Sequence, residues 1–253
     1  MNSADRVYLS ASQPAEDTLY RRGTELDNAT AHPASEYDRD VRQVIPFYDS
    51  IHQETIDLVR TVKPNAAFWL DTGCGTGHLV DLALPLFPGT QFILADPSDS
   101  MLQQAKRCLQ RTGGSRVKFL PPVGSEGLAS QMTGLKCQVI TGIQCHHYLD
   151  KPQREQALRS CFDVLEDGGL LIVSEHITML TNRGVQVALE RWGRWQQNLG
   201  RSPSAVAAHL KRSNTEYFPI TVEEHLALLK SVGFRTVELF WFSQMQAIFY
   251  GIK

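Results

Sequence analysis

The strongest candidate for chemistry is a glycine-rich turn directly after a short apolar run. The sequence LDTGCGTG at residues 70–77 places glycines at alternate positions. Glycine lets the backbone turn tightly and approach a ligand without a Cβ clash, and the helix predicted after the turn offers free N–H groups to a polar or anionic group. The spacing is GxGxG, with His78 where a dinucleotide-binding turn has its third glycine. The turn predicts a ligand site and disfavours a nicotinamide dehydrogenase.

A single acidic residue follows the turn at the distance expected for sugar recognition. Asp96 lies nineteen residues after Gly77 and ends an apolar run. A carboxylate at the end of a second strand accepts hydrogen bonds from the hydroxyls of a ribose that bears no 2′-phosphate. The alternative is that Asp96 only caps a helix beginning near Ser98. The neighbouring glycines favour the ribose interpretation.

A third polar segment, TGIQCHHY at residues 141–148, follows another apolar run. In open α/β sheets, ligands bind at the carboxyl ends of the strands, so this segment should face the ligand. His146 or His147 is a candidate general base for an acceptor hydroxyl or amine. Glu175, followed by His176, is a further catalytic candidate after the next strand. The alternative for these histidines is local packing and hydrogen bonding.

The elements that must position these residues alternate between strands and helices. Apolar runs predict strands, and amphipathic stretches predict helices between them. This order indicates a doubly wound, mostly parallel sheet with helices on both faces. The predicted strands are 67–71, 91–95, 117–120, 138–143 and 170–174, and the predicted helices are 41–62 (interrupted near Pro46), 78–87, 98–109, 153–165 and 222–231.

Both ends of the chain depart from this alternation. Residues 1 to about 35 are polar and predict an arm, and residues 1–60 together are expected to form an N-terminal arm with cover helices. Residues 61–253 should form the main domain. A helical insert is expected at about 177–220, as a lid. Residues 235–242 and 245–252 predict an antiparallel hairpin at the end of the sheet, giving seven strands.

These features resemble the class I S-adenosylmethionine-dependent methyltransferases, a Rossmann-like family, over about residues 37–253. The resemblance implies S-adenosylmethionine as cofactor and S-adenosylhomocysteine as product. It places Asp71 and the glycine turn against the methionine part, Asp96 against the ribose, and Gln144 beside the sulfonium. Ser125 stands where the family commonly has an aspartate that binds the adenine. The cofactor contacts expected in full are Tyr37, Asp71, Gly73, Cys74, Gly75, Gly77, Asp96, Pro97, Met101, Ser125 and Gln144.

A narrower resemblance is to the carboxy-S-adenosylmethionine synthases and related methyltransferases. It rests on YD at 37–38, RQVIPFY at 42–48, the charged pair at 211–212 and the ending from Val232 to Ile252. In the synthases an arginine of the insert pairs with the extra carboxylate of the modified cofactor. Arg212 matches it by position, and a guanidinium suits a carboxylate. A solvated helix charge is the alternative.

Aromatic residues supply the remaining substrate candidates. Trp192 and Trp195 on the insert could line an acceptor pocket, where aromatic rings attract a sulfonium. Packing of the lid against the core is the alternative for both. Tyr48 should reach the site from the N-terminal cover.

Composition narrows the class of protein. The net charge is −2 and the isoelectric point is near 6.4, which disfavours a nucleic-acid partner. No apolar run approaches a membrane span, and the N-terminus has no secretory signal. Five cysteines without a CxxC pair indicate reduced thiols and no metal site. A cytoplasmic location follows, and a homodimer stays open.

The sequence therefore predicts an enzyme that transfers a methyl group from S-adenosylmethionine to a small-molecule acceptor by in-line displacement. Because the cofactor is already activated, the protein mainly orients the reactants, with the lid closing over a small substrate. Two alternatives stay open: a synthase-like modification of the cofactor, and a protein that binds the cofactor without catalysis.

Overall fold

The computed structural model describes residues 28–30 and 32–253 of the chain. Most of the predicted N-terminal arm lies outside these residues. Seven strands form one sheet, in the order β3-β2-β1-β4-β5-β7-β6. The strands are β1 Phe68–Thr72, β2 Gln91–Ala95, β3 Val117–Phe119, β4 Cys137–Ile143, β5 Leu165–His176, β6 Thr236–Ser243 and β7 Gln246–Ile252.

Pairing within the sheet confirms the predicted topology. β1 is parallel to both β2 and β4, β2 to β3, and β4 to β5. β7 is antiparallel to β5 and to β6, so the last two strands form the expected hairpin. The carboxyl ends of β1, β2, β4 and β5 therefore meet at one edge of the sheet, where the predicted site residues follow them.

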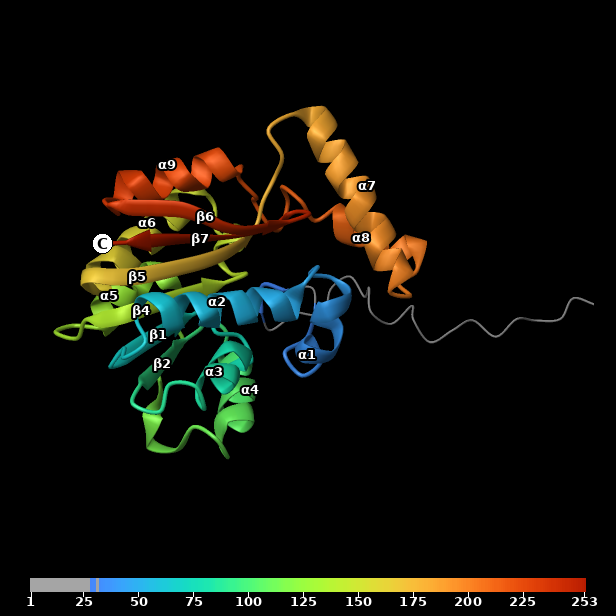
Figure 1. Cartoon of the computed structure of the whole chain (residues 1–253). Helices are drawn as coiled ribbons and strands as arrows, with labels where there is room; N and C mark the ends of the chain where they lie inside the picture. Colours follow the sequence, from blue (N-terminus) through green and yellow to red (C-terminus); the bar gives the residue numbers. More distant parts are fainter. Residues whose placement is uncertain (1–27, 31) are drawn as a thin grey trace, which may run out of the picture.

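Helices cover both faces of this sheet (Figure 1). One core cluster joins α2, α3 and α4 to one face, and a second joins α5, α6 and α9 to the other. α7 and α8 lie beyond the sheet, at the same end as α1. The helices are α1 Tyr37–Asp40, α2 Tyr48–Val62, α3 His78–Ala83, α4 Asp99–Leu109, α5 Leu128–Gln131, α6 Lys151–Val164, α7 Asn182–Asn198, α8 Pro203–Leu210 and α9 Val222–Val232, and the 3₁₀ turns are η2 Val41–Gln43, η3 Gly114–Arg116, η4 Ser125–Gly127 and η5 His146–Tyr148.

Local capping explains where the helices near the site begin. The Ser98 side chain accepts from the Met101 N–H and begins α4, and Asp150 with Gln153 forms a capping box at α6. Thr181 and Ser202 cap the two helices of the insert in the same way. These caps fix the helix starts next to the carboxyl ends of the strands.

Several predicted boundaries differ from those of the structure, most by one or two residues and those of α3 and β5 by more. α3 ends at Ala83 instead of residue 87 because Pro85, which follows the helical C-cap Leu84, has no N–H to donate to the carbonyl four residues before it. β5 begins at Leu165 instead of residue 170, since Leu165 already pairs with Cys137 across a register shift. β3 ends at Phe119, one residue early. The interruption near Pro46 is confirmed, with Phe47 in the left-handed region at φ 59°.

Among the described helices, none is long and apolar enough to cross a membrane. All five cysteines are free thiols.

Candidate active site

The glycine turn after β1 is held in shape by short contacts to β2. The Cys74 N–H donates to the Ala95 carbonyl at 3.0 Å, and the Gly75 N–H donates to Asp96 Oδ2 at 2.9 Å. Gly73 has φ 62°, and a Cβ there would lie 2.4 Å from the Cβ of Cys145. The turn therefore requires glycine at position 73 for both conformation and space.

The other two glycines of the turn serve different purposes. Gly75 has φ 53°, and among the described residues no atom lies within 4 Å of the position its Cβ would take. Its backbone thus borders open space. Gly77 begins α3 at φ 80°, and its Cβ would lie 3.2 Å from Ala105 on α4. Gly77 permits close packing of the two helices, and it is not part of the lining of the cavities below.

A cleft of about 610 Å³ opens beside this turn. Asp96 borders it with each carboxylate oxygen already accepting one backbone N–H, from Gly75 and from Ser98. The second lone pair on each oxygen stays available for a ligand. The lining consists of Asn28, Ala29, Thr30, Tyr37, Gly73, Gly75, Asp96, Pro97, Ser98, Met101, Ile143, Gln144, Cys145, Tyr148, Leu149 and Gln153.

The cleft fits an adenosine compound in size and in chemistry. Its volume lies within the usual range for ligand pockets, about 300–1,000 Å³. A carboxylate that can accept two hydroxyls stands beside apolar Pro97 and Met101. Ser125 does not reach it: its hydroxyl contacts Thr72 Oγ1 at 2.8 Å and His146 Nε2 at 2.9 Å. Ser125 therefore supports the floor of the site.

A second, smaller cavity of about 30 Å³ adjoins the turn on the side of α2. Asp71, Cys74, Tyr37 and Tyr48 line it together with the turn. Asp71 Oδ1 accepts from Thr141 Oγ1 at 2.6 Å, and burial raises the pKa of its carboxyl to about 7. The N-terminal segment is tied to the turn here, because Thr76 Oγ1 donates to Asp38 at 2.6 Å. Tyr37 and Tyr48 therefore both lie beside the glycine turn, and their predicted contacts with cofactor and substrate stay predictions.

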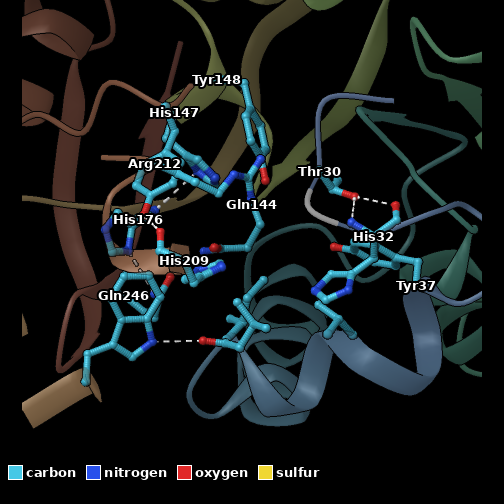
Figure 2. Close-up of a pocket in the computed structure, with 15 residues that line it drawn as sticks. Thr30, His32, Tyr37, Gln144, His147, Tyr148, His176, His209, Arg212 and Gln246 are labelled. Atoms are coloured by element: carbon cyan, nitrogen blue, oxygen red, sulfur yellow. Dashed lines mark hydrogen bonds between the residues drawn. The ribbon is translucent and has the colours of Figure 1, made fainter. Parts of the chain in front are cut away.

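A third cavity, of about 40 Å³, adjoins the cleft and is called the inner cavity (Figure 2). It shares four lining residues with the cleft, Thr30, Tyr37, Gln144 and Tyr148. Figure 2 shows Gln144 between His176, His209 and Gln246 on one side and Thr30, His32 and Tyr37 on the other. The rest of the lining is Val41, Val44, Ile45, His147, Trp192, Arg212 and Tyr217.

Gln144 separates the cleft from the inner cavity in a strained backbone conformation. Its φ is 57°, which is uncommon for a residue with a side chain. Two hydrogen bonds hold it there, from its N–H to the Ser174 carbonyl at 2.7 Å and from its amide to Ser174 Oγ at 2.9 Å. Strain of this kind is typical of functional sites.

The two neighbouring histidines have different surroundings. His146 is enclosed, with Nε2 on Ser125, and it lines neither the cleft nor the inner cavity. His147 lines the inner cavity, and its Nδ1 lies 3.1 Å from Glu175 Oε2. Burial lowers the pKa of His147 to about 3 and raises that of the Glu175 carboxyl to about 7. The His147 ring is therefore neutral at pH 7 and oriented by a buried carboxyl group.

Arg154 holds this part of the site in place. Its fully buried guanidinium donates to the carbonyls of His146, Leu149 and Phe218. The Phe218 N–H in turn donates to the His147 carbonyl at 2.7 Å. The end of the insert is thus attached to the turn that carries both histidines.

The insert supplies one of its two predicted tryptophans to the inner cavity. Trp192 lines it and donates from Nε1 to the Val44 carbonyl at 2.8 Å. Trp195 is not part of the lining and packs against the cluster under the insert, which contains Val44, Ala188 and Met245. Arg212 lines the cavity, with Nε on Glu216 at 2.6 Å and its guanidinium over the Tyr217 ring.

The sequence patterns did not single out several lining residues. His209 lies one helical turn before Arg212, and this spacing was a usable signal. Thr30 and His32 fall in the segment expected to be an arm, and Gln246 begins a strand without any local motif. These residues are brought together by the fold alone.

Comparison with known proteins agrees with this geometry. Residues 70–171 match a family model described as a methyltransferase domain. The match begins in β1 and ends in β5, so it contains the glycine turn, Asp96 and both histidines. The chain carries an S-adenosylmethionine-dependent methyltransferase domain.

Relatives of this methyltransferase are found among curated proteins and solved structures. A carboxy-S-adenosyl-L-methionine synthase from Campylobacter curvus is 25% identical over 206 residues, covering 81% of this chain and 85% of that one. An O-methyltransferase family protein from Burkholderia thailandensis has a TM-score of 0.58 at 17% identity, covering 87% of this chain. The chain spans 62% of the length of that protein. The N-methyltransferase NodS from Bradyrhizobium japonicum has a TM-score of 0.57 at 13% identity, covering 82% and 97%.

These findings confirm the predicted fold, family and cofactor class. The solved structures include oxygen and nitrogen methyltransferases with the same fold. A fold alone does not define which atom accepts the methyl group.

Proposed function

We propose that this methyltransferase acts on a small molecule bound in the inner cavity, with the cofactor in the cleft. The observation that carries the proposal is the shared wall, since Tyr37, Gln144 and Tyr148 line both spaces. A molecule in the inner cavity would stand directly against a cofactor in the cleft. The small volume and the covering insert favour a small acceptor over a polymer.

Several residues would hold the cofactor. Asp96 would accept hydrogen bonds from the ribose hydroxyls. The Gly73–Gly75 backbone would border the methionine part, and Pro97 and Met101 would pack against the adenine. When bound, S-adenosylmethionine supplies an activated methyl group. The chain itself orients the acceptor and excludes water, and such orientation can lower a barrier by about 7–11 kcal/mol.

We assign the role of general base to His147, with Glu175 as the residue that positions it. The neutral ring can accept a proton from an acceptor hydroxyl or amine through Nε2, while Nδ1 stays directed at Glu175. A carboxylate at 3.1 Å stabilises the imidazolium that forms. His146 has no such access because Ser125 occupies its Nε2.

The first experiment is mass spectrometry of the small molecule released by denaturing the purified protein. We expect S-adenosylmethionine or S-adenosylhomocysteine. Formation of S-adenosylhomocysteine is then followed against a panel of small alcohols, amines and thiols. Turnover of any of them would remove the non-catalytic alternative, whereas no adenosine compound and no binding on addition would refute the proposal.

The base is tested with His147→Gln and a matched control, His225→Gln, a buried histidine that stacks on Phe249 outside the cavity. Loss of a general base lowers kcat by about 100-fold or more, with S-adenosylmethionine affinity unchanged. An equal loss in both variants would contradict the assignment.

A second candidate function, synthesis of a carboxylated cofactor, is favoured by one observation. Arg212 is buried and lines the inner cavity beside Gln144, and the Campylobacter relative is named for that activity. If it holds, Arg212→Ala abolishes binding of carboxy-S-adenosylmethionine and leaves S-adenosylmethionine bound. A released cofactor heavier by one carboxyl group would favour it directly.

A further inference from the structure

The inner cavity contains buried polar atoms that have no hydrogen-bond partner among the described residues. They include Nε2 of His176, Nδ1 of His209 and Oε1 of Gln246. These three residues are 4%, 4% and 1% exposed, and all line the cavity. An unpaired buried polar group is costly, so such a group in a cavity indicates a missing partner.

His176 and Gln246 form a fixed pair across the sheet. They are direct partners in the antiparallel pairing of β5 and β7. The Gln246 Nε2 atom lies 3.1 Å from His176 Nδ1. Burial lowers the pKa of His176 to about 3, so the ring is neutral and has one donor and one acceptor nitrogen.

This pair leaves at least one donor and at least one acceptor unused, whichever way the amide is oriented. If Gln246 donates to Nδ1, the ring carries its proton on Nε2, and Gln246 Oε1 is the unused acceptor. If the amide is reversed, Nδ1–H donates to the amide oxygen, so Nε2 is an unused acceptor and both amide N–H groups are unused donors. In either orientation, the pair can therefore both donate a hydrogen bond to a ligand and accept one from it.

We propose that the His176–Gln246 pair recognises an uncharged group on the methyl acceptor that both donates and accepts a hydrogen bond, a hydroxyl or a carboxamide. This rests on the proposed function, because it takes the inner cavity as the acceptor site. A carboxylate only accepts and an ammonium only donates, so either would leave one half of the pair unmatched. A site of this kind strongly rejects analogues that lack the hydrogen-bonding group.

The rest of the lining agrees with an uncharged acceptor of small size. Burial lowers the pKa of His32, His147 and His209, so these neighbours are neutral too. The charge of Arg212 is already paired with Glu216 at 2.6 Å. Val41, Val44 and Ile45 provide an apolar side. The volume of about 40 Å³ holds roughly three waters.

The test uses four probes on one carbon skeleton: isobutanol, isobutyramide, isobutyrate and isobutylamine. Each is titrated by NMR into the protein saturated with S-adenosylhomocysteine. We expect isobutanol and isobutyramide to bind at least about tenfold more tightly than the two charged probes. Tighter binding of isobutyrate or isobutylamine would overturn the proposal.

Variants locate the binding to the pair. His176→Phe and Gln246→Leu each remove the match at similar volume and should weaken isobutyramide binding about tenfold. His225→Phe is the control and should change nothing. An unchanged affinity in both site variants would overturn the proposal.

S-adenosylhomocysteine affinity is measured for the wild type and for every variant. It separates a failure of the His176–Gln246 proposal from a failure of the proposed function. Loss of S-adenosylhomocysteine affinity in the variants alone would reveal misfolding. In that case isobutyramide is soaked into crystals of the wild-type protein. Contact between isobutyramide and the pair would support the proposal, and no contact would overturn it. Absence of S-adenosylhomocysteine affinity in the wild type would refute the proposed function itself.

Discussion

The cleft and the inner cavity are built in contrasting ways. The cleft depends on a turn of a few consecutive residues and on Asp96, all at the ends of neighbouring parallel strands. The inner cavity collects side chains from the N-terminal segment, η5, the ends of β5 and β7, and the insert. One region is set by local backbone geometry, and the other by the meeting of distant segments.

This difference separates a general function from a particular one. A cofactor shared by many enzymes can be held by one short motif, whereas an acceptor must be matched by side chains that vary around it. We therefore expect changes in the turn to act on cofactor binding, and changes in the inner cavity to act on the acceptor or on local stability. Four substitutions test this contrast.

The largest effect is expected from Gly73→Ala. The new Cβ would lie 2.4 Å from the Cβ of Cys145 at a φ of 62°. Strain and overpacking together cost about 4 kcal/mol, enough to abolish S-adenosylhomocysteine binding in calorimetry. Gly89→Ala is the control, since no described atom lies within 4 Å of its Cβ position. Normal binding by Gly73→Ala would show that the turn is not the rigid part of the site.

Glu175→Gln should reveal the cost of a buried charge in the inner region. Burial raises the pKa of this carboxyl from 4.5 to about 7, so the stability linked to its protonation is full below pH 4.5 and is lost as the pH rises through 7. The variant should be more stable than the wild type, by about 1 kcal/mol near pH 5.5 and about 3 kcal/mol above pH 8.

Denaturant unfolding at the two pH values measures this difference. Glu190→Gln, on the exposed face of α7, serves as control and should show no gain in stability at either pH. A gain that is the same at both pH values would contradict the raised pKa of Glu175.

Asp96→Asn should weaken the cofactor without disturbing the inner cavity. The amide keeps the shape but loses the charge that accepts from Gly75, Ser98 and the ribose. Hydrogen bonds to a charged group contribute about 1.5–3 kcal/mol, so calorimetry should show roughly a 10- to 100-fold loss of S-adenosylhomocysteine affinity. Asp99→Asn, exposed at the first position of α4, should bind normally. Equal losses would point to the helix start instead of the ribose.

The smallest effect, a loss of stability, is expected when the two tryptophans of the insert are each replaced by phenylalanine. Trp192→Phe removes the hydrogen bond to the Val44 carbonyl that joins the insert to the N-terminal segment, at a cost of about 1 kcal/mol. Trp195→Phe removes no hydrogen bond to the cavity wall and should cost less. Thermal unfolding measures both, with cofactor affinity unchanged. A larger effect at Trp195 would show that packing under α7, and not the bond to Val44, holds the insert.

The sequence by itself determined the cofactor half of this protein. The alternation of strands and helices, the GxGxG turn and Asp96 predicted the fold, the family and the cofactor correctly. Such features are legible because they depend on neighbours along the chain, through strand periodicity, glycine conformation and helix caps. The predicted cytoplasmic location, the homodimer and the domain limits stay predictions.

Only the tertiary structure decided the other half. Adjacent histidines are equivalent in a sequence, and the 3₁₀ turn after β4 directs His147 to the cavity while Ser125 encloses His146. Gln246 acquires its role because antiparallel pairing sets it opposite His176, seventy residues away. The physical reason is that partners of a buried polar group are chosen by proximity in space, which the packing of distant segments creates and local sequence does not encode.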